Sequence, residues 1–127
     1  MALMIPVSAG ELVDKITILR VKLQRIEAAK RANVEKELQL LEAVAARELA
    51  DTPEIRACTD ELFTVNAALW DVEEAKRDCE RRQDFGPAFI RLARAVYVEN
   101  DRRAAIKRRI NTAAGSDLVE EKSYRPY

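Results

Sequence analysis

The chain has 127 residues, of which 48% are hydrophobic and 35% charged, and its 22 basic and 22 acidic side chains give a formal net charge of zero. This length suits one domain, and the composition excludes both a disordered acidic chain and a membrane-spanning protein. A general nucleic-acid-binding protein carries a basic surplus, which this chain lacks. The complete absence of histidine excludes a Ser-His-Asp hydrolase, a histidine-bearing zinc site and a Glu-x-x-His di-iron bundle.

The two cysteines and the first residues of the chain indicate the compartment. Cys58 and Cys79 fall in one predicted helix, and a rise of about 1.5 Å per residue places them roughly 30 Å apart, beyond disulfide reach. Cysteines that cannot pair within the chain indicate a reducing compartment. Residues 1–7 are apolar but lack the basic start of a signal peptide, and no segment is long enough for a membrane span. We therefore expect a cytoplasmic protein.

The first half of the chain predicts two antiparallel helices, at about residues 9–30 and 33–50. Ser8 and Glu11 have the S-x-x-E spacing of a capping box, in which side chains satisfy free amides at a helix start. From Leu12 to Ile26, apolar residues recur at alternating steps of four and three, as in helical bundles. Further apolar residues flank this stripe, so we expect the first helix to contact more than one neighbour.

The second half predicts two long helices, at about residues 53–83 and 87–114. We expect the N-terminal arm (1–7) and the C-terminal tail (116–127) to be irregular. Thr52 is a predicted N-cap, Pro53 suits the first helical position, and Gly86-Pro87 marks the break between the helices. We predict one all-α domain, an antiparallel bundle of about four helices whose last two form a long hairpin. The hairpin outreaches the shorter helices, which predicts a homodimer that covers its ends.

Polar residues interrupt the apolar stripes at matching heights. If the hairpin folds back near residue 85, residues whose numbers sum to about 170 lie level. This register places Asn66 near Arg103 and Trp70 near Asn100, and it allows the first helix to reach the same height. It defines a candidate polar pocket of Asp14, Lys15, Asn66, Trp70, Glu73, Tyr97, Asn100 and Arg103.

Two interpretations of this polar set remain open. It can be a pocket for a small anionic ligand, with Arg103 and Lys15 as charge partners and Trp70 as a stacking wall. It can equally be a buried hydrogen-bond network that fixes helix register, or charged groups at the rim that reach water. The structural interpretation is the more common outcome for such sets.

Two charged clusters complete the candidate list. Cations late in the last helix could contact phosphates, but they also complement the helix dipole in any protein, and no aromatic residues are interleaved with them. A face with Asp71, Glu74 and Asp78 could hold a divalent metal, but alternating basic residues favour a solvated surface, so we predict neither a metal site nor a cofactor. The basic cluster comprises Arg102, Arg103, Lys107, Arg108 and Arg109.

Several segments resemble a small bacterial family of uncharacterised helical proteins over nearly the whole chain. The resemblance implies membership of that family but no activity, and it places the polar set within the family's characteristic segments. These segments are IPVSAGELVDKITIL at 5–19, VNAALWDVE at 65–73, LARAVY at 92–97 continuing to NDRR at 100–103, and VEEKSY at 119–124.

The leading functional hypothesis is a non-enzymatic, homodimeric helical module that binds a protein partner or scaffolds an assembly. The alternative is a protein or small enzyme that binds an anionic metabolite, in which Glu73 or Asp14 would serve as the base. A second alternative is nucleic-acid binding through the basic end of the last helix. No recognised catalytic motif is present, which favours a non-enzymatic role.

Overall fold

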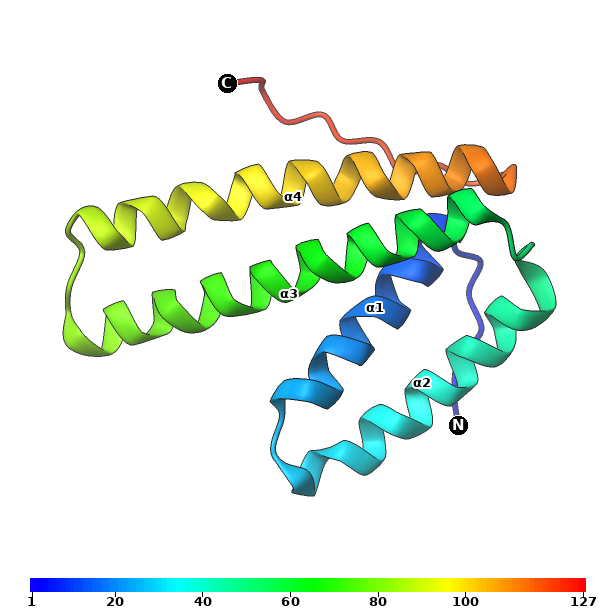
Figure 1. Cartoon of the computed structure of the whole chain (residues 1–127), viewed down its shortest axis with the longest axis horizontal. Coiled ribbons are helices and arrows are strands. Elements are labelled where there is room, and N and C mark those ends of the chain that lie inside the picture. Colours follow the sequence, from blue (N-terminus) through cyan, green and yellow to red (C-terminus); the bar gives the residue numbers. More distant parts are fainter.

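The computed structural model describes all 127 residues and consists of four α-helices (Figure 1). It confirms the all-α class and the long terminal hairpin. None of the helices combines the length and the apolar character that crossing a membrane requires. The helices are α1 (Ala9–Arg25), α2 (Ala28–Glu48), α3 (Pro53–Arg82) and α4 (Pro87–Ala114).

The predicted caps of α1 and α3 are confirmed, with one difference in the first cap. Ser8 Oγ accepts a hydrogen bond from the Glu11 amide at 3.0 Å, and Thr52 Oγ1 accepts one from the Ile55 amide at 3.2 Å. Pro53 occupies the first turn of α3. The reciprocal half of the capping box is not formed, because the Glu11 carboxylate pairs with Lys107 and Lys15 instead.

The connection between α1 and α2 lies earlier than the predicted position near residues 31–32. Helix α1 ends at Arg25, the backbone at Ile26 is extended, and α2 begins at Ala28. Residues 27–32 contain neither Gly nor Pro, so no local signal marks the bend. Arg31 Nη1 donates to the Leu23 carbonyl at 2.7 Å and satisfies one of the free carbonyls at the end of α1.

The hairpin turn lies at the predicted break before Gly86-Pro87, and α3 ends one residue before the predicted 83, but Gly86 is not the residue that ends it. The left-handed residue that ends α3 is Gln83, with φ 55°, whereas Gly86 is the N-cap of α4 with an ordinary φ of −78°. Gly115 ends α4 in the left-handed conformation, with φ 64°.

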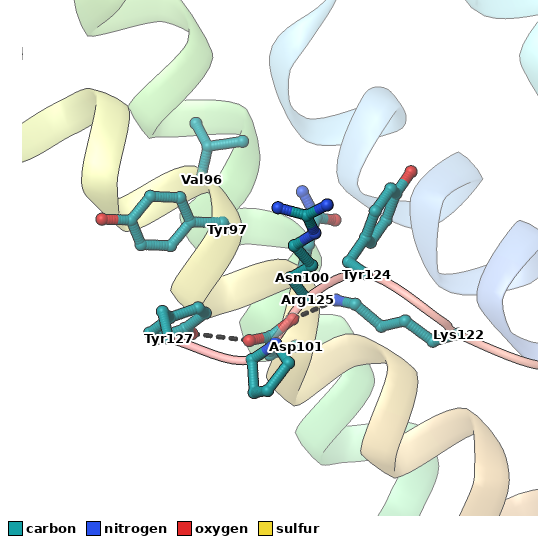
Figure 2. Close-up of a pocket in the computed structure, with 9 residues that line it drawn as sticks. Val96, Tyr97, Asn100, Asp101, Lys122, Tyr124, Arg125 and Tyr127 are labelled. Carbon is teal, nitrogen blue, oxygen red and sulfur yellow. Dashed lines mark hydrogen bonds and ion pairs between the residues drawn. The ribbon is translucent and has the colours of Figure 1, made fainter.

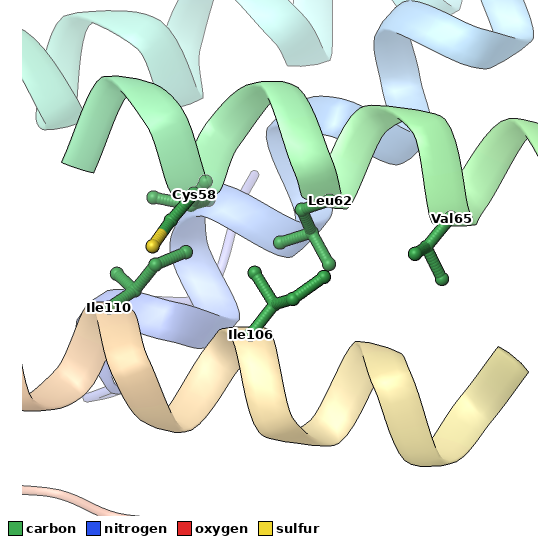
Figure 3. Packing of buried hydrophobic residues seen from close by; sticks show 6 residues of the cluster. Cys58, Leu62, Val65, Ile106 and Ile110 are labelled. Carbon is green, nitrogen blue, oxygen red and sulfur yellow. The ribbon is translucent and has the colours of Figure 1, made fainter. Parts of the chain in front are cut away.

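Helix α1 belongs to both hydrophobic clusters of the core, as its wide apolar surface predicted. One cluster joins α1 and α2, and the other joins α1 to the hairpin, with side chains of α3 and α4 facing each other (Figure 3). The first contains Leu12, Ile16, Leu19 and Leu38, and the second contains Val13, Cys58, Leu62, Val65, Ile106 and Ile110.

The four helices form two hairpins that share α1. Helix α2 packs against α1 alone, while α1 packs against α2, α3 and α4. Helix α1 starts beside the open end of the α3–α4 hairpin and diverges from it, so the hairpin extends beyond α1 (Figure 1). We call residues 55–66 and 103–111 the covered half of the hairpin, and residues 69–97 its free half. In the free half only Cys79 is buried.

Candidate functional site

Asp14 on α1 is the centre of a polar junction between α1, α3 and α4. Its side chain is only 1% exposed. Arg103 of α4 donates Nε to Oδ1 at 2.9 Å and Nη2 to Oδ2, and Asn66 of α3 donates Nδ2 to Oδ1 at 2.9 Å. A two-point contact between guanidinium and carboxylate fixes both distance and orientation. The three helices are therefore held in register by one buried carboxylate.

Thr17, one turn further along α1, completes the inner part of the junction. Its hydroxyl donates to the Asp14 carbonyl at 2.9 Å and accepts from Asn66 Nδ2 at 2.9 Å. No buried side-chain nitrogen or oxygen in the protein lacks a hydrogen-bond partner. Because a buried polar group without a partner is costly, this saturation is what a structural network requires.

The outer part of the junction joins α4 to the start of α1 and to the C-terminal tail. Lys107 Nζ lies 2.7 Å from Glu11 Oε2, and 3.9 Å from both Asp14 and Glu120. Glu120 in the tail accepts from Ser8 Oγ at 2.6 Å and from Asn111 Nδ2 at 3.2 Å. The residue that caps α1 is thus also tied to the tail.

Gly10 permits the close approach of α1 and α4 at this point. Its amide donates to Asn111 Oδ1 at 2.6 Å. A Cβ atom at residue 10 would lie 2.5 Å from the Lys107 carbonyl oxygen and 3.0 Å from Asn111 Oδ1. The nearer of these atoms belongs to the backbone and cannot move alone, so only glycine fits here.

The charges of the junction shift two pKa values. The hydrogen bonds from Arg103 to Asp14 raise the pKa of the guanidinium despite its partial burial. At Glu120, burial opposes ionisation, but hydrogen bonds from Ser8 and Asn111 and the charge of Lys107 help to lower the pKa of the carboxyl group. Both groups therefore remain charged at neutral pH, and their interactions persist.

The structure divides the predicted polar set among separate locations. Asp14, Asn66 and Arg103 meet in the junction, which confirms the predicted level of Asn66 and Arg103. Lys15 points elsewhere: its side chain is 48% exposed and pairs only with Glu11, at 3.7 Å. Tyr97 and Asn100 line a different groove, between α4 and the tail.

A groove of about 440 Å³ lies between α1 and the free half of the hairpin, beside the junction. Trp70 and Glu73 line it together with Arg103 and Asn66, so part of the predicted set shares this space. Glu73 is already paired with Arg77 at 3.0 Å and with Lys76 at 3.3 Å. The groove thus contains an aromatic wall and an arginine, but its carboxylate is occupied.

The basic cluster does not form one free cationic surface. Arg102 pairs with Glu99 at 3.0 Å, and Arg108 with Glu121 at 3.0 Å. Arg109 contacts Glu61 at 2.5 Å and Glu54 at 3.2 Å on α3, while Lys107 and Arg103 belong to the junction. Because each cation has a carboxylate partner, little charge is available for a phosphate backbone.

The acidic face of α3 is also divided by ion pairs. Asp71 pairs with Arg25 of α1 at 3.1 Å, and Asp78 pairs with Arg81. No group of three or more Cys, Asp or Glu side chains converges as metal ligands would. Both cysteines lie on α3, are buried and are free. Burial raises the pKa of the Cys58 thiol, which keeps it protonated.

Sequence reasoning missed several members of the junction: Gly10, Thr17, Asn111 and Glu120. A signal existed for Asn111, since it directly follows the apolar stripe residues Ile106 and Ile110 near the end of α4. A glycine within the first turn of a helix was a second signal, because glycine there weakens the helix unless a neighbour approaches closely. Glu120 lies in the irregular tail, where its only signal was its place in the segment at 119–124 that resembles the family.

The fold and the junction together define an all-α protein in which a polar network joins α1 to one end of a long helical hairpin. The chain belongs to DUF6165, a family of unknown function, whose model matches residues 3–126. No curated protein and no solved structure matches the chain. The family assignment agrees with the resemblance found in the sequence segments, and it assigns no activity to the polar junction.

Proposed function

We propose that this protein is a non-enzymatic, homodimeric helical module, and that a second copy covers the free half of the α3–α4 hairpin. The observation that carries this proposal is the size of its surface. The accessible area is 8874 Å², whereas a folded monomer of 14.4 kDa exposes about 6,800 Å². The excess of about 2,000 Å² exceeds the roughly 800 Å² that each partner buries in a standard interface.

The free half of the hairpin supplies suitable apolar area. Val72, Phe89 and Leu92 are only half-buried, because the two helices pack on each other there without a third. Phe85 and Ile90 are 48% and 53% exposed, and Phe85 packs edge-on against Phe89. Exposed apolar surface of this extent favours association. The extended arm and tail account for a further part of the excess area.

The polar junction supports a structural role over a catalytic one. Each of its buried side-chain nitrogens and oxygens already has a hydrogen-bond partner within the chain, as a structural network requires. We also propose that the protein works in the bacterial cytoplasm, a reducing compartment suited to its two free, buried cysteines. A protein partner bound by the dimer remains part of this proposal.

The mass in solution tests the dimer. Light scattering after size exclusion, over a range of concentrations, should give twice 14.4 kDa. Trp70→Glu and Ile90→Glu place a charge on the free half of the hairpin, and at least one should shift the mass to that of a monomer. The matched control is Leu40→Glu, at a 58% exposed leucine of α2 away from the hairpin, which should leave the dimer intact. A monomer at every concentration contradicts the proposal.

A further inference from the structure

The C-terminal tail returns along α4 and is held there by polar contacts instead of by burial. Glu121 pairs with Arg108 at 3.0 Å, and Asp101 on α4 accepts from the Tyr127 hydroxyl at 2.5 Å and from Lys122 Nζ. The apolar and aromatic residues of the tail remain exposed, namely Leu118, Val119, Tyr124 and Tyr127. The tail therefore adds little to the core. Together with α4 it forms a groove.

This tail groove has a volume of about 820 Å³, within the range of small-molecule sites. All three tyrosines of the chain line it. Tyr97 projects from α4, and Tyr124 from the tail lies on the opposite side of the space between them (Figure 2). Tyr127 packs against Tyr97, with ring centroids 5.0 Å apart and planes inclined by 45°. Aromatic rings arranged in this way offer flat surfaces on which another ring can stack.

Among the side chains that line the groove, one positive charge has no partner. Asp101 is neutralised by Lys122, and the bonds from Lys122 and Tyr127 lower the pKa of this carboxyl group, which keeps it ionised. Arg125 forms no ion pair and no hydrogen bond within the chain, and Figure 2 shows its guanidinium between the rings of Tyr97 and Tyr124. An unpaired guanidinium beside aromatic rings is a ready partner for a carboxylate or phosphate.

Asn100 adds a second donor to the same place. Its side-chain oxygen accepts from Arg103 Nη1 at 3.4 Å, which orients the amide nitrogen away from that bond. Asn100 and Arg125 both line the groove (Figure 2). An anion bound by Arg125 can therefore also accept a hydrogen bond from Asn100.

We propose that the tail groove binds a small planar aromatic molecule that carries one anionic group, either a carboxylate or a phosphate. Arg125 and Asn100 hold the anion, and Tyr97 and Tyr124 contact the ring. The single uncompensated charge suits one anionic group and does not suit a polyanion such as a nucleic acid. The groove meets the free half of the hairpin only at Val96 and Tyr97, and it meets the polar junction only through the bond between Asn100 and Arg103. Binding at the groove does not require the dimer.

Isothermal titration calorimetry with defined probes tests the site. AMP and indole-3-acetate each combine an aromatic ring with an anion, as a phosphate and as a carboxylate respectively. Adenosine supplies the aromatic ring without the anion, and inorganic phosphate supplies the anion without the ring. We expect saturable binding of at least one aromatic anion. Adenosine and inorganic phosphate should each bind at least about tenfold more weakly. Comparison of AMP with indole-3-acetate shows which of these two aromatic anions the groove prefers.

Variants of the groove residues assign the binding to this site. Arg125→Ala and Tyr124→Ala should each weaken the binding about tenfold, and Arg125→Lys should restore part of it. Both side chains lie on the exposed tail, so neither change should lower the melting temperature. Arg94→Ala is the matched control, because Arg94 is an exposed arginine of α4 without an ion pair and outside the groove. Affinity unchanged in Arg125→Ala, or no saturable binding of either aromatic anion at millimolar concentration, overturns the proposal.

Discussion

The covered and free halves of the α3–α4 hairpin continue the same two helices but differ in packing. Where α1 lies against the hairpin, the stripe through Cys58, Leu62, Ile106 and Ile110 is buried almost completely. In the free half the stripe continues through Val72 and Leu92, yet these residues are only half-buried. The same sequence pattern therefore gives a closed core only where a third helix is present.

The charged residues of the two halves differ in the same way. Asp14 and Arg103 meet where the carboxylate is 1% exposed, whereas Glu73 and Arg77 pair on the free half with exposed fractions of 41% and 71%. A buried pair is costly to break, because its removal leaves a charge without water or partner, while an exposed pair contributes little. Position in the fold, more than residue type, decides what each pair contributes.

The largest difference between the halves should appear when one carboxylate is removed from each. Asp14→Ala leaves Arg103 and Asn66 without their shared acceptor and should lower the free energy of unfolding by about 4 kcal/mol. Glu73→Ala removes a solvated pair and should cost less than about 1 kcal/mol. Urea denaturation followed by circular dichroism measures both values. Equal costs would show that the junction is no more important to stability than a surface ion pair.

A smaller contrast is expected for matched leucine truncations. Leu62→Ala, at a fully buried position, should destabilise the protein by about 3 kcal/mol, through lost burial and the cavity left behind. Leu92→Ala, at a half-buried position, should cost about 1 kcal/mol in dilute protein. Urea unfolding at two protein concentrations sharpens the comparison. If a second copy covers the free half, the destabilisation by Leu92→Ala should rise with protein concentration, because dimer formation adds to the stability. A Leu92 cost that matches that of Leu62 in dilute protein would refute the distinction.

The smallest expected effect is the pH dependence that Glu120 gives to the covered half. Its folded pKa lies below the unfolded value of 4.5, so its contribution to stability is present above that value. It is lost as pH falls through the lower, folded pKa. Thermal unfolding between pH 3 and pH 7 should therefore show a shallower acid decline in Glu120→Gln than in the parent chain. Superimposable pH profiles would mean that the tail does not tie to Ser8 and Asn111 in solution.

Much of the fold could be predicted from local sequence signals. Ser8, Thr52 and Gly115 act as the caps that their residue types indicate, and the apolar spacing defines the helices. The α1–α2 bend was misplaced because residues 27–32 are good helix formers and nothing local interrupts them. The bend is set by packing, since α2 must turn there for Leu38 to reach α1.

The candidate site was predicted only in part. The hairpin register brought Asn66 and Arg103 to one height, and Asp14 followed from the expected packing of α1. Lys15 and Tyr97 were misassigned to the same place, because residue height along a helix does not specify the face on which a side chain emerges from the bundle. Gly10 and Glu120 escaped notice because their roles depend on segments far away in the chain.

The sequence by itself determined the helical class, the starts of α1, α3 and α4 and the long hairpin, because capping residues, prolines and apolar periodicity act through neighbours within a few residues. Only the tertiary structure decided which polar residues meet, where α1 ends and how the tail returns along α4. Those features depend on contacts between distant residues, such as Gly10 with Asn111 and Asp101 with Tyr127, whose energies appear only once the helices are packed.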